Sequence, residues 1–247
     1  METPEEQALP KLVRLLWDLD DPGSRGPKRG MSLDEILEAA IAVADAEGYA
    51  ALSMSRVAKQ LGFTTMSLYR YVDSKETLVE LLLDRLVGAP PALPADAGWR
   101  AGLEAWAWGE FRAIRVHPWW LDIPISAPPL GPKNMDWLEA GLTAMADAPL
   151  PEPVKLQMVT NLSLYVIGRA RFLKDTVQRS EDDTDYAAIL AQVLDPARYP
   201  AITSALSHRA FDDDDMHWEE ADFRFSLDRL LDGYEHFITK FTSTPTN

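Results

Sequence analysis

Residues 53–75 read SMSRVAKQLGFTTMSLYRYVDSK, and this stretch decides the fold. Ser53 can accept a hydrogen bond from a free backbone N–H group and so begin a short helix. The inward side of that helix carries Val57, Ala58 and Leu61. Gly62 stands where a tight turn needs a positive φ, and Thr64 can cap a second helix that turns Leu68 and Val72 inward. The spacing predicts a helix-turn-helix.

The second helix leaves its outer side free of acidic residues. This side carries Thr65, Met66, Ser67, Tyr69, Arg70 and Tyr71. Hydroxyl, phenol and guanidinium groups can bond phosphates and base edges in a DNA major groove, and no carboxylate repels the DNA backbone. A helical hairpin inside a protein core would show the same two-helix spacing, so the hairpin alone leaves that alternative open.

The flanks favour the DNA-binding interpretation. Residues 33–52 predict an amphipathic helix that ends at Gly48. After the hairpin, Asp73 or Ser74 can cap a further helix, whose apolar residues are Leu78, Leu81, Leu82 and Leu86. A helix, a helix-turn-helix and a fourth helix together make a complete small domain.

Residues 33–86 resemble the DNA-binding domain of tetracycline-repressor (TetR) family regulators in ADAEGYAALSM, VAKQLG and MSLYRYVDSKETL. Weaker similarity to the C-terminal domain of that family lies in HPW (117–119), PPLGP (128–132) and DFRFSLDRLLDGYE (222–235). The resemblance implies an all-α fold, with a three-helix DNA-binding domain joined by a linking helix to a larger helical ligand-binding and dimerisation domain. It also implies a regulator, expected to be a repressor, that a small molecule releases from operator DNA.

The resemblance assigns roles by position. It implies DNA contacts from Ser55 and Arg56, base or groove contacts from Thr65, Met66 and Ser67, and phosphate contacts from Tyr69, Tyr71 and Lys75. We add Thr64 and Arg70 to the predicted interface, although Arg70 stands where the family varies. Met66 can make only an apolar contact, for example with a thymine methyl group.

A basic segment precedes the first helix of the domain and carries Arg25, Lys28 and Arg29. Its prolines and glycines keep it extended or turned, so it can act as an arm on phosphates or in a minor groove. A tail with ordinary charges is the alternative. Residues 9–20 predict an amphipathic helix that packs on a domain or a partner. We predict an extension (1–24), a helix-turn-helix domain with the arm (25–75), and an effector-binding and dimerisation domain (76–247).

The charge is unevenly distributed along the chain. The net charge of −15 is unusual for a DNA-binding protein, but residues 180–222 hold twelve acidic residues against only Arg198 and Arg209. Residues 22–75 hold seven basic and six acidic residues. We therefore expect a local basic surface on an acidic body, with modest and salt-sensitive affinity for non-specific DNA.

Several functional classes find no support in the sequence. The chain has no cysteine, which excludes disulfides and cysteine zinc sites. It has no apolar run of about 18 residues and no signal-peptide pattern, so we expect a cytoplasmic protein without a membrane partner. No phosphate loop, GxSxG, HExxH or dinucleotide motif is present. We expect no enzyme activity and no cofactor; a helical enzyme with a histidine–carboxylate pair is the remote alternative.

The rest of the chain predicts helices near 98–116, 133–147, 153–179, 186–194 and 219–241, with a short one at 199–208. The helices at 153–179 and 219–241 are long and apolar along one side, and we expect them to pair two subunits in a four-helix interface. The apolar sides carry Met158, Leu162, Tyr165, Val166 and Val177 in one helix, and Phe223, Leu227, Leu230, Leu231, Tyr234 and Phe237 in the other.

Seven of the eight tryptophans lie beyond residue 98. We predict an apolar or aromatic effector against Trp106, Phe111, Trp119, Trp120 and Trp137, with Tyr165 and Arg169 nearby; plain core packing is the alternative. Arg169 and Arg171 can bind an anionic or carbonyl group or form an intersubunit ion pair. The segments IPISAPP (123–129) and RARFL (169–173) lack the histidine and carboxylate with which tetracycline repressors hold a metal–drug chelate, so we expect no metal site. A regulator controlled without a ligand, or by a protein partner, is the alternative function.

Overall fold

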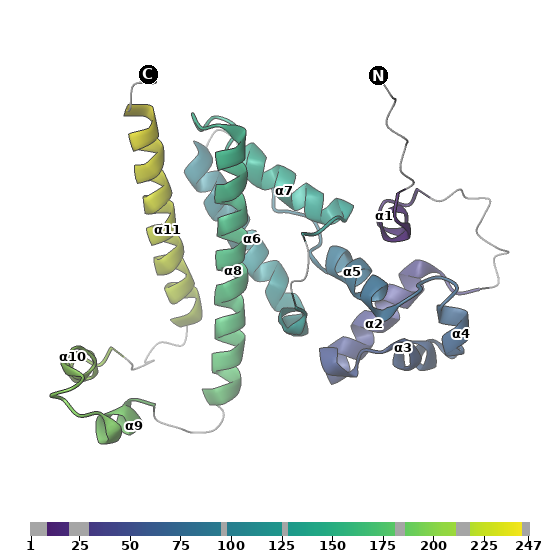
Figure 1. Ribbon diagram of the computed structural model, residues 1–247, viewed down its shortest axis with the longest axis horizontal. Helices are drawn as coiled ribbons and strands as arrows, with labels where there is room; N and C mark the ends of the chain where they lie inside the picture. Colours follow the sequence, from purple (N-terminus) through teal and green to yellow (C-terminus); the bar gives the residue numbers. More distant parts are fainter. Residues whose placement is uncertain are drawn as a thin grey trace, which may run out of the picture. The chain divides into compact units, whose positions relative to one another are not determined.

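The computed structural model describes residues 9–19, 30–94, 98–124, 128–180, 186–210 and 218–243. Every regular element within these ranges is helical (Figure 1), which confirms the all-α prediction. The main helices are α1 (Lys11–Leu16), α2 (Leu33–Glu47), α3 (Met54–Leu61), α4 (Thr65–Leu68), α5 (Lys75–Leu86), α6 (Gly98–Val116), α7 (Pro132–Ala144), α8 (Glu152–Ser180), α9 (Tyr186–Val193), α10 (Pro200–Ser207) and α11 (Trp218–Ser243). Two 3-10 turns, η2 (Tyr49–Ala51) and η3 (Pro118–Asp122), complete the set.

The described chain divides into two compact units. The first runs to Ala170 and includes the chain from Ile238 onward, and the second runs from Arg171 to Phe237. In the second unit, α9 and α10 contact one another. None of the described helices is both long enough and apolar enough to cross a membrane.

The helix-turn-helix forms because its local caps are satisfied. The Ser53 hydroxyl accepts from the backbone N–H of Arg56 at 3.2 Å, as predicted. Gly62 adopts φ 74°, and the next residue, Phe63, donates its N–H to Ala58 O at 2.9 Å, which closes α3 in a Schellman arrangement. Thr64 then caps α4 by accepting from Ser67 N–H at 3.2 Å.

The helix boundaries on either side of the hairpin agree with the prediction. The first helix ends at Glu47, with Gly48 (φ 79°) as its C-cap as predicted, and η2 follows it. Ser74 rather than Asp73 caps α5, since its hydroxyl accepts from Thr77 N–H at 3.0 Å. The Asp73 carboxylate instead accepts from the Thr77 hydroxyl at 2.7 Å. The pKa of Asp73 is lowered, first by this bond from Thr77 and further by Lys11.

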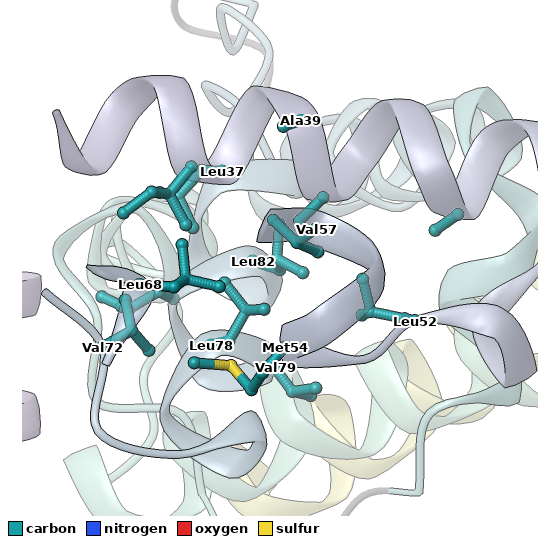
Figure 2. Packing of buried hydrophobic residues seen from close by; sticks show 14 of the residues in the cluster. Leu37, Ala39, Leu52, Met54, Val57, Leu68, Val72, Leu78, Val79 and Leu82 are labelled. Carbon is teal, nitrogen blue, oxygen red and sulfur yellow. The ribbon is translucent and has the colours of Figure 1, made fainter. Parts of the chain in front are cut away.

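Helices α2 to α5 enclose one apolar core. Leu68 and Val72 point into the same cluster as Leu78 and Leu82 of α5 (Figure 2). All four side chains have no exposed surface. Burying a leucine or valine side chain contributes roughly 1.5–3 kcal/mol, so this core fixes the position of the short α4, which has too few residues to form a stable helix alone.

Helix α1 packs on this domain, as predicted for residues 9–20. It contacts α5, and its half-buried leucines, Leu12, Leu15 and Leu16, join the apolar cluster. Beyond the helix, the indole N–H of Trp17 donates to Leu130 O at 2.9 Å. The residues on either side of this segment, 1–8 and 20–29, lie outside the described ranges.

The long helices bury the side that we expected to face a second subunit. Met158, Leu162 and Val166 of α8 are buried within the single chain. The same holds for the predicted apolar side of α11 at Phe223, Leu227, Leu231 and Tyr234. That part of the prediction is wrong, because these residues belong to the core of one chain. Tyr165 and Leu230 are half-buried, and Phe237 is 45% exposed. The side chain of Val177 lies outside the described part of the structure.

Asp84 of α5 joins the DNA-binding core to α7. Its Oδ1 accepts from both the backbone N–H and the side-chain Nδ2 of Asn134, each at 3.0 Å. A carboxylate at this position satisfies a free N–H in the first turn of α7 and complements the positive end of the helix dipole. Gly131 makes the contact possible, because a Cβ at this position would overlap the Asp84 carboxylate.

This contact predicts a non-additive effect on stability. Asp84→Ala should lower the free energy of unfolding by about 2 kcal/mol, because the first turn of α7 loses its acceptor. Gly131→Ala should also destabilise, because the new methyl group collides with the carboxylate. The double substitution should lower the free energy of unfolding by less than the sum of the two single losses, since the shortened side chain at position 84 makes room for the methyl group. Urea denaturation at one protein concentration measures this, and additive losses would contradict the contact.

Candidate functional site

The outer face of the helix-turn-helix is open to solvent, as the sequence predicted. Met66 is 75% exposed, and Tyr69 is 42% exposed. Arg70 and Ser55 are exposed as well, while Thr65, Ser67 and Tyr71 are half-buried. Phe63, in the turn between α3 and α4, is 45% exposed. The sequence analysis did not select Phe63, because a phenylalanine after a turn glycine usually packs inward against the preceding helix.

Two hydroxyl groups at the start of α4 are bonded to one another. Thr64 Oγ1 and Ser67 Oγ lie 2.9 Å apart, and Thr64 also accepts from the Ser67 N–H. Because both groups take part in the cap, each keeps only part of its hydrogen-bonding capacity for another molecule.

Arg56 is held by neighbouring side chains. Its Nη2 lies 2.6 Å from Glu47 Oε1, and its Nη1 donates to Gln60 at 3.0 Å. The hydrogen bond from Arg56 lowers the pKa of the Glu47 carboxyl group. Lys75, at the start of α5, places Nζ 5.0 Å from the centre of the Tyr49 ring, a cation–π arrangement. Both cations are therefore oriented by the protein before any other molecule binds.

The described chain resumes at Gly30 directly against Tyr71. A Cβ on Gly30 would lie 2.7 Å from the Tyr71 hydroxyl oxygen, so only glycine fits without displacing that phenol. Arg25, Lys28 and Arg29, the predicted basic arm, lie outside the described residues. They immediately precede the contact at the end of the helix-turn-helix.

Asp45 of α2 bridges the helix-turn-helix domain to the segment after α6. Its Oδ1 lies 2.7 Å from His117 Nδ1 and accepts from the Trp119 indole N–H at 2.6 Å. Trp119 is only 6% exposed and belongs to the same apolar cluster as α2 to α5, and Trp120 packs against that cluster. We refer to these contacts of Asp45, His117 and Trp119 as the Asp45 bridge.

The predicted aromatic wall is thereby divided. Trp119 and Trp120 pack on the helix-turn-helix domain, whereas Trp106 and Trp137 form an edge-on pair with ring centres 5.8 Å apart. The Trp106 indole N–H donates to Trp137 O at 2.8 Å, and the Trp137 indole N–H donates to Val87 O at 3.0 Å. Phe111 is buried on α6, the helix of Trp106. The buried indole groups thus bond protein acceptors, and Trp137 holds the end of α5.

A buried carboxyl group lies between α6 and α8. Glu110 Oε1 accepts from the Ser163 hydroxyl at 2.6 Å, and Oε2 is shielded from solvent although the residue as a whole is half-exposed. Burial raises the pKa of Glu110 to about 8, and the bond from Ser163 opposes this shift. Glu110 is therefore mostly protonated at neutral pH, which makes it a possible hydrogen-bond donor.

The other predicted effector residues, Tyr165 and Arg169, are half-buried on α8. Arg171 is exposed. Among the described residues, no group of three or more histidine or acidic side chains could hold a metal ion.

Asp45, Asp84 and Ser163 were not predicted from the sequence. Each acts through a partner 50 or more residues away, at separations of 72 to His117, 50 to Asn134 and 53 to Glu110. The glycine in PPLGP was the available signal for Asp84, since a glycine before a helix-starting proline can indicate a close approach. No local pattern identified the other two.

Comparison with known proteins agrees with this geometry. The family described as bacterial regulatory proteins, tetR family, matches residues 36–82. The tetracyclin repressor-like C-terminal domain matches residues 90–238. The HTH-type transcriptional repressor DrrR1 of Streptomyces coeruleorubidus is 40% identical over 250 residues, which covers 97% of this chain and 90% of that protein.

Solved structures show the same fold. ActR from Streptomyces coelicolor without ligand has a TM-score of 0.73 at 21% identity, covering 87% of this chain and 99% of its own. ActR in complex with actinorhodin has a TM-score of 0.71 at 22% identity, covering 83% and 95%. With both domains matched in the expected order, the chain belongs to the TetR family of DNA-binding transcription regulators.

Proposed function

We propose that this protein is a dimeric repressor that binds a near-palindromic operator through α4 of each subunit and is released by a bulky, largely apolar or aromatic small molecule. The outer face of α4 carries the proposal. Hydroxyl and thioether groups stand on α4, phenol and guanidinium groups stand in the turn that follows it, and no acidic residue occurs from Met54 to Val72. The relative DrrR1 is named a repressor, which supports repression rather than activation of transcription.

The DNA contacts divide into base and phosphate contacts. We propose that Thr65, Met66 and Ser67 face base edges and that Tyr69, Tyr71 and Lys75 bind phosphates. Further contacts come from Ser55, Arg56, Thr64 and Arg70. Arg56 either exchanges Glu47 for a phosphate or uses it to aim its guanidinium group. Phe63 adds an apolar contact beside Met66, because both are exposed at the start of α4.

The contact between Gly30, which follows the basic arm, and Tyr71 supports a role for the arm in DNA binding. Arg29 precedes Gly30 by one residue, and consecutive Cα atoms are about 3.8 Å apart. Since Gly30 lies against Tyr71, the described chain resumes beside the proposed phosphate-binding side of the domain. We propose that Arg25, Lys28 and Arg29 follow the DNA backbone or the adjacent minor groove.

The dimer interface is proposed on the exposed sides of α8 and α11. On α8, exposed residues recur every four positions at Leu156, Thr160, Leu164, Gly168 and Phe172. On α11 they recur at Phe225, Arg229, Gly233, Phe237 and Phe241. Nothing lies within 4 Å of a Cβ placed on Gly168 or Gly233, so another helix can approach closely there. Stripes of exposed aromatic and aliphatic residues on long helices indicate an interaction surface, and a second copy of the chain covers them by two-fold symmetry.

Effector binding is proposed to act on DNA affinity through two routes. One is the end of α5, which α7 holds through Asp84–Asn134 and through Trp137. The other is the Asp45 bridge, which holds α2 to the segment after α6. We propose that a flat effector near Trp106, Phe111 and Trp137 displaces these helices and changes the separation of the two α4 helices. A differential affinity of about 1–3 kcal/mol changes operator binding roughly 5- to 150-fold.

Substitutions in the helix-turn-helix should separate affinity from specificity. Lys75→Ala should weaken all duplexes alike and reduce the slope of log affinity against log salt by about one unit, because one phosphate contact is lost. Thr65→Ala should instead relax the preference at one operator position. Binding selection from random duplexes, followed by salt titrations, measures both effects. Lys133→Ala on α7 is the charge-matched control, and an unchanged binding motif in Thr65→Ala would reject the assigned recognition helix.

A charged side chain introduced into the exposed stripe of α8 should separate the two subunits. Leu164→Glu, at a side chain that is 55% exposed, should lower the mass measured by light scattering from twice 27.6 kDa to 27.6 kDa. The reason is the cost of burying an unpaired charge. Val116→Glu, at a side chain 69% exposed on α6, is the control and should leave the mass unchanged. A wild-type protein that stays monomeric at micromolar concentration would rule out the proposed dimer.

Loss of the Trp119 contact of the Asp45 bridge should reduce the effector response while operator binding persists. A library of flat aromatic compounds, including actinorhodin, is first screened for release of the wild-type protein from its operator. Trp119→Phe, which removes only the indole N–H contact to Asp45, should then reduce the effect of a releasing compound about 5-fold. Trp99→Phe on α6 is the control. An equal response in both variants would exclude the Trp119 contact from coupling, and a library without any releasing compound would contradict effector control.

A further inference from the structure

The Glu110 carboxyl group has an incomplete set of partners. Oε1 accepts from Ser163 at 2.6 Å, but Oε2 is buried and has no hydrogen-bond partner among the residues that the structure describes. Buried polar atoms are almost always satisfied, and leaving one unsatisfied is unfavourable. A leucine would suit packing between α6 and α8 better, so packing alone gives no reason for a glutamate at this position.

Apolar and aromatic groups surround the pair along both helices. One turn before Glu110 on α6 is Trp106, and one turn before Ser163 on α8 is Val159. Both meet α7 at Gly141, where a Cβ would lie 2.6 Å from Val159 Cγ1 and 3.3 Å from Trp106 Nε1. On the other sides, Phe111, Ile114, Leu162 and Val166 are buried. The carboxyl group is thus a polar point in a largely apolar region, which is the composition typical of small-molecule sites.

The hydrogen bond from Ser163 determines which oxygen of Glu110 carries the proton. Because the Ser163 hydroxyl donates to Oε1, the proton of the neutral acid resides on Oε2. Burial keeps the pKa of Glu110 at about 8, so the group is an O–H donor at neutral pH. Glu110 as a whole is half-buried, but its Oε2 is shielded from solvent, so a ligand must displace neighbouring side chains to reach it.

We propose that Glu110 and Ser163 form the polar anchor of the effector site and select an uncharged aromatic molecule through one carbonyl oxygen. The Glu110 O–H donates to that oxygen, and the aromatic body of the ligand lies along Trp106 and Phe111. This inference rests on the proposed control by a small molecule, and it adds the chemical class of that molecule.

Three related probes test the anchor: fluorenone has a carbonyl oxygen, fluorene has none, and 9-(aminomethyl)fluorene carries a cationic alkylammonium group. Equilibrium dialysis against the full chain without DNA measures their affinities. The wild-type protein should bind fluorenone about 5-fold more tightly than fluorene, which corresponds to one net hydrogen bond. Glu110→Leu should abolish this preference, and Glu110→Gln should keep it, because an amide N–H also donates. Glu104→Leu on the same helix is the control and should keep it too.

The pH dependence gives a second readout. In the wild-type protein the preference for fluorenone should fall as pH rises through about 8, where Glu110 loses its proton. Glu110→Gln has no proton to lose, so its preference should stay constant. Arg112 and Arg115 on α6 and Tyr165 and Arg169 on α8 are titratable groups near the pair in sequence, and the glutamine variant corrects for their contribution.

Several results would contradict the proposal that Glu110 and Ser163 anchor the effector. They are no binding of fluorenone, equal affinity for fluorenone and fluorene, tighter binding of the 9-(aminomethyl)fluorene cation, or a preference for fluorenone that survives in Glu110→Leu. Operator binding by Glu110→Leu and by Ser163→Ala verifies that the variants fold, and Ser163→Ala should change fluorenone affinity in the same experiment. If the anchor fails while another compound releases the operator, the proposed function stands and only the chemical class is wrong.

Discussion

The end of α5 is the constraint on which the rest of this structure depends. The helix supplies Leu78 and Leu82 to the core that fixes α4. At its other end, Asp84 caps α7, and the carbonyl group of Val87 accepts from Trp137. A displacement of α7 must therefore break these hydrogen bonds or carry α5 with it. Because interiors are close-packed and deform little, α5 transmits such a displacement to the helix-turn-helix core.

The parts of the fold that the sequence predicted are those with local causes. Ser53, Gly62 and Thr64 act within four residues of themselves, so spacing alone identified the caps and the turn. The long helices were predicted close to their observed ranges because their apolar periodicity extends over several turns. The family match was reached in the same way, from motifs with a fixed local spacing.

The parts that the sequence did not predict depend on distant partners. The apolar sides of α8 and α11 were assigned to a second subunit, because periodicity shows that a side is buried but not what buries it. Tryptophans 119 and 137 were grouped in one wall, yet their indole groups bond to acceptors on α2 and α5. No role was predicted for Glu110 from the sequence, since its partner Ser163 lies 53 residues further along the chain.

The contact between Gly30 and Tyr71 limits what the arm can read. An extended chain spans at most about 3.3–3.6 Å per residue, so the five residues from Arg25 to Arg29 reach roughly 17 Å from Gly30. Half-sites of a two-fold operator lie about 34 Å apart or at multiples of that distance. In the proposed dimer each arm would therefore be confined to the DNA beside its own half-site, and the length of the arm would limit how far its contacts extend from the bases proposed to meet α4.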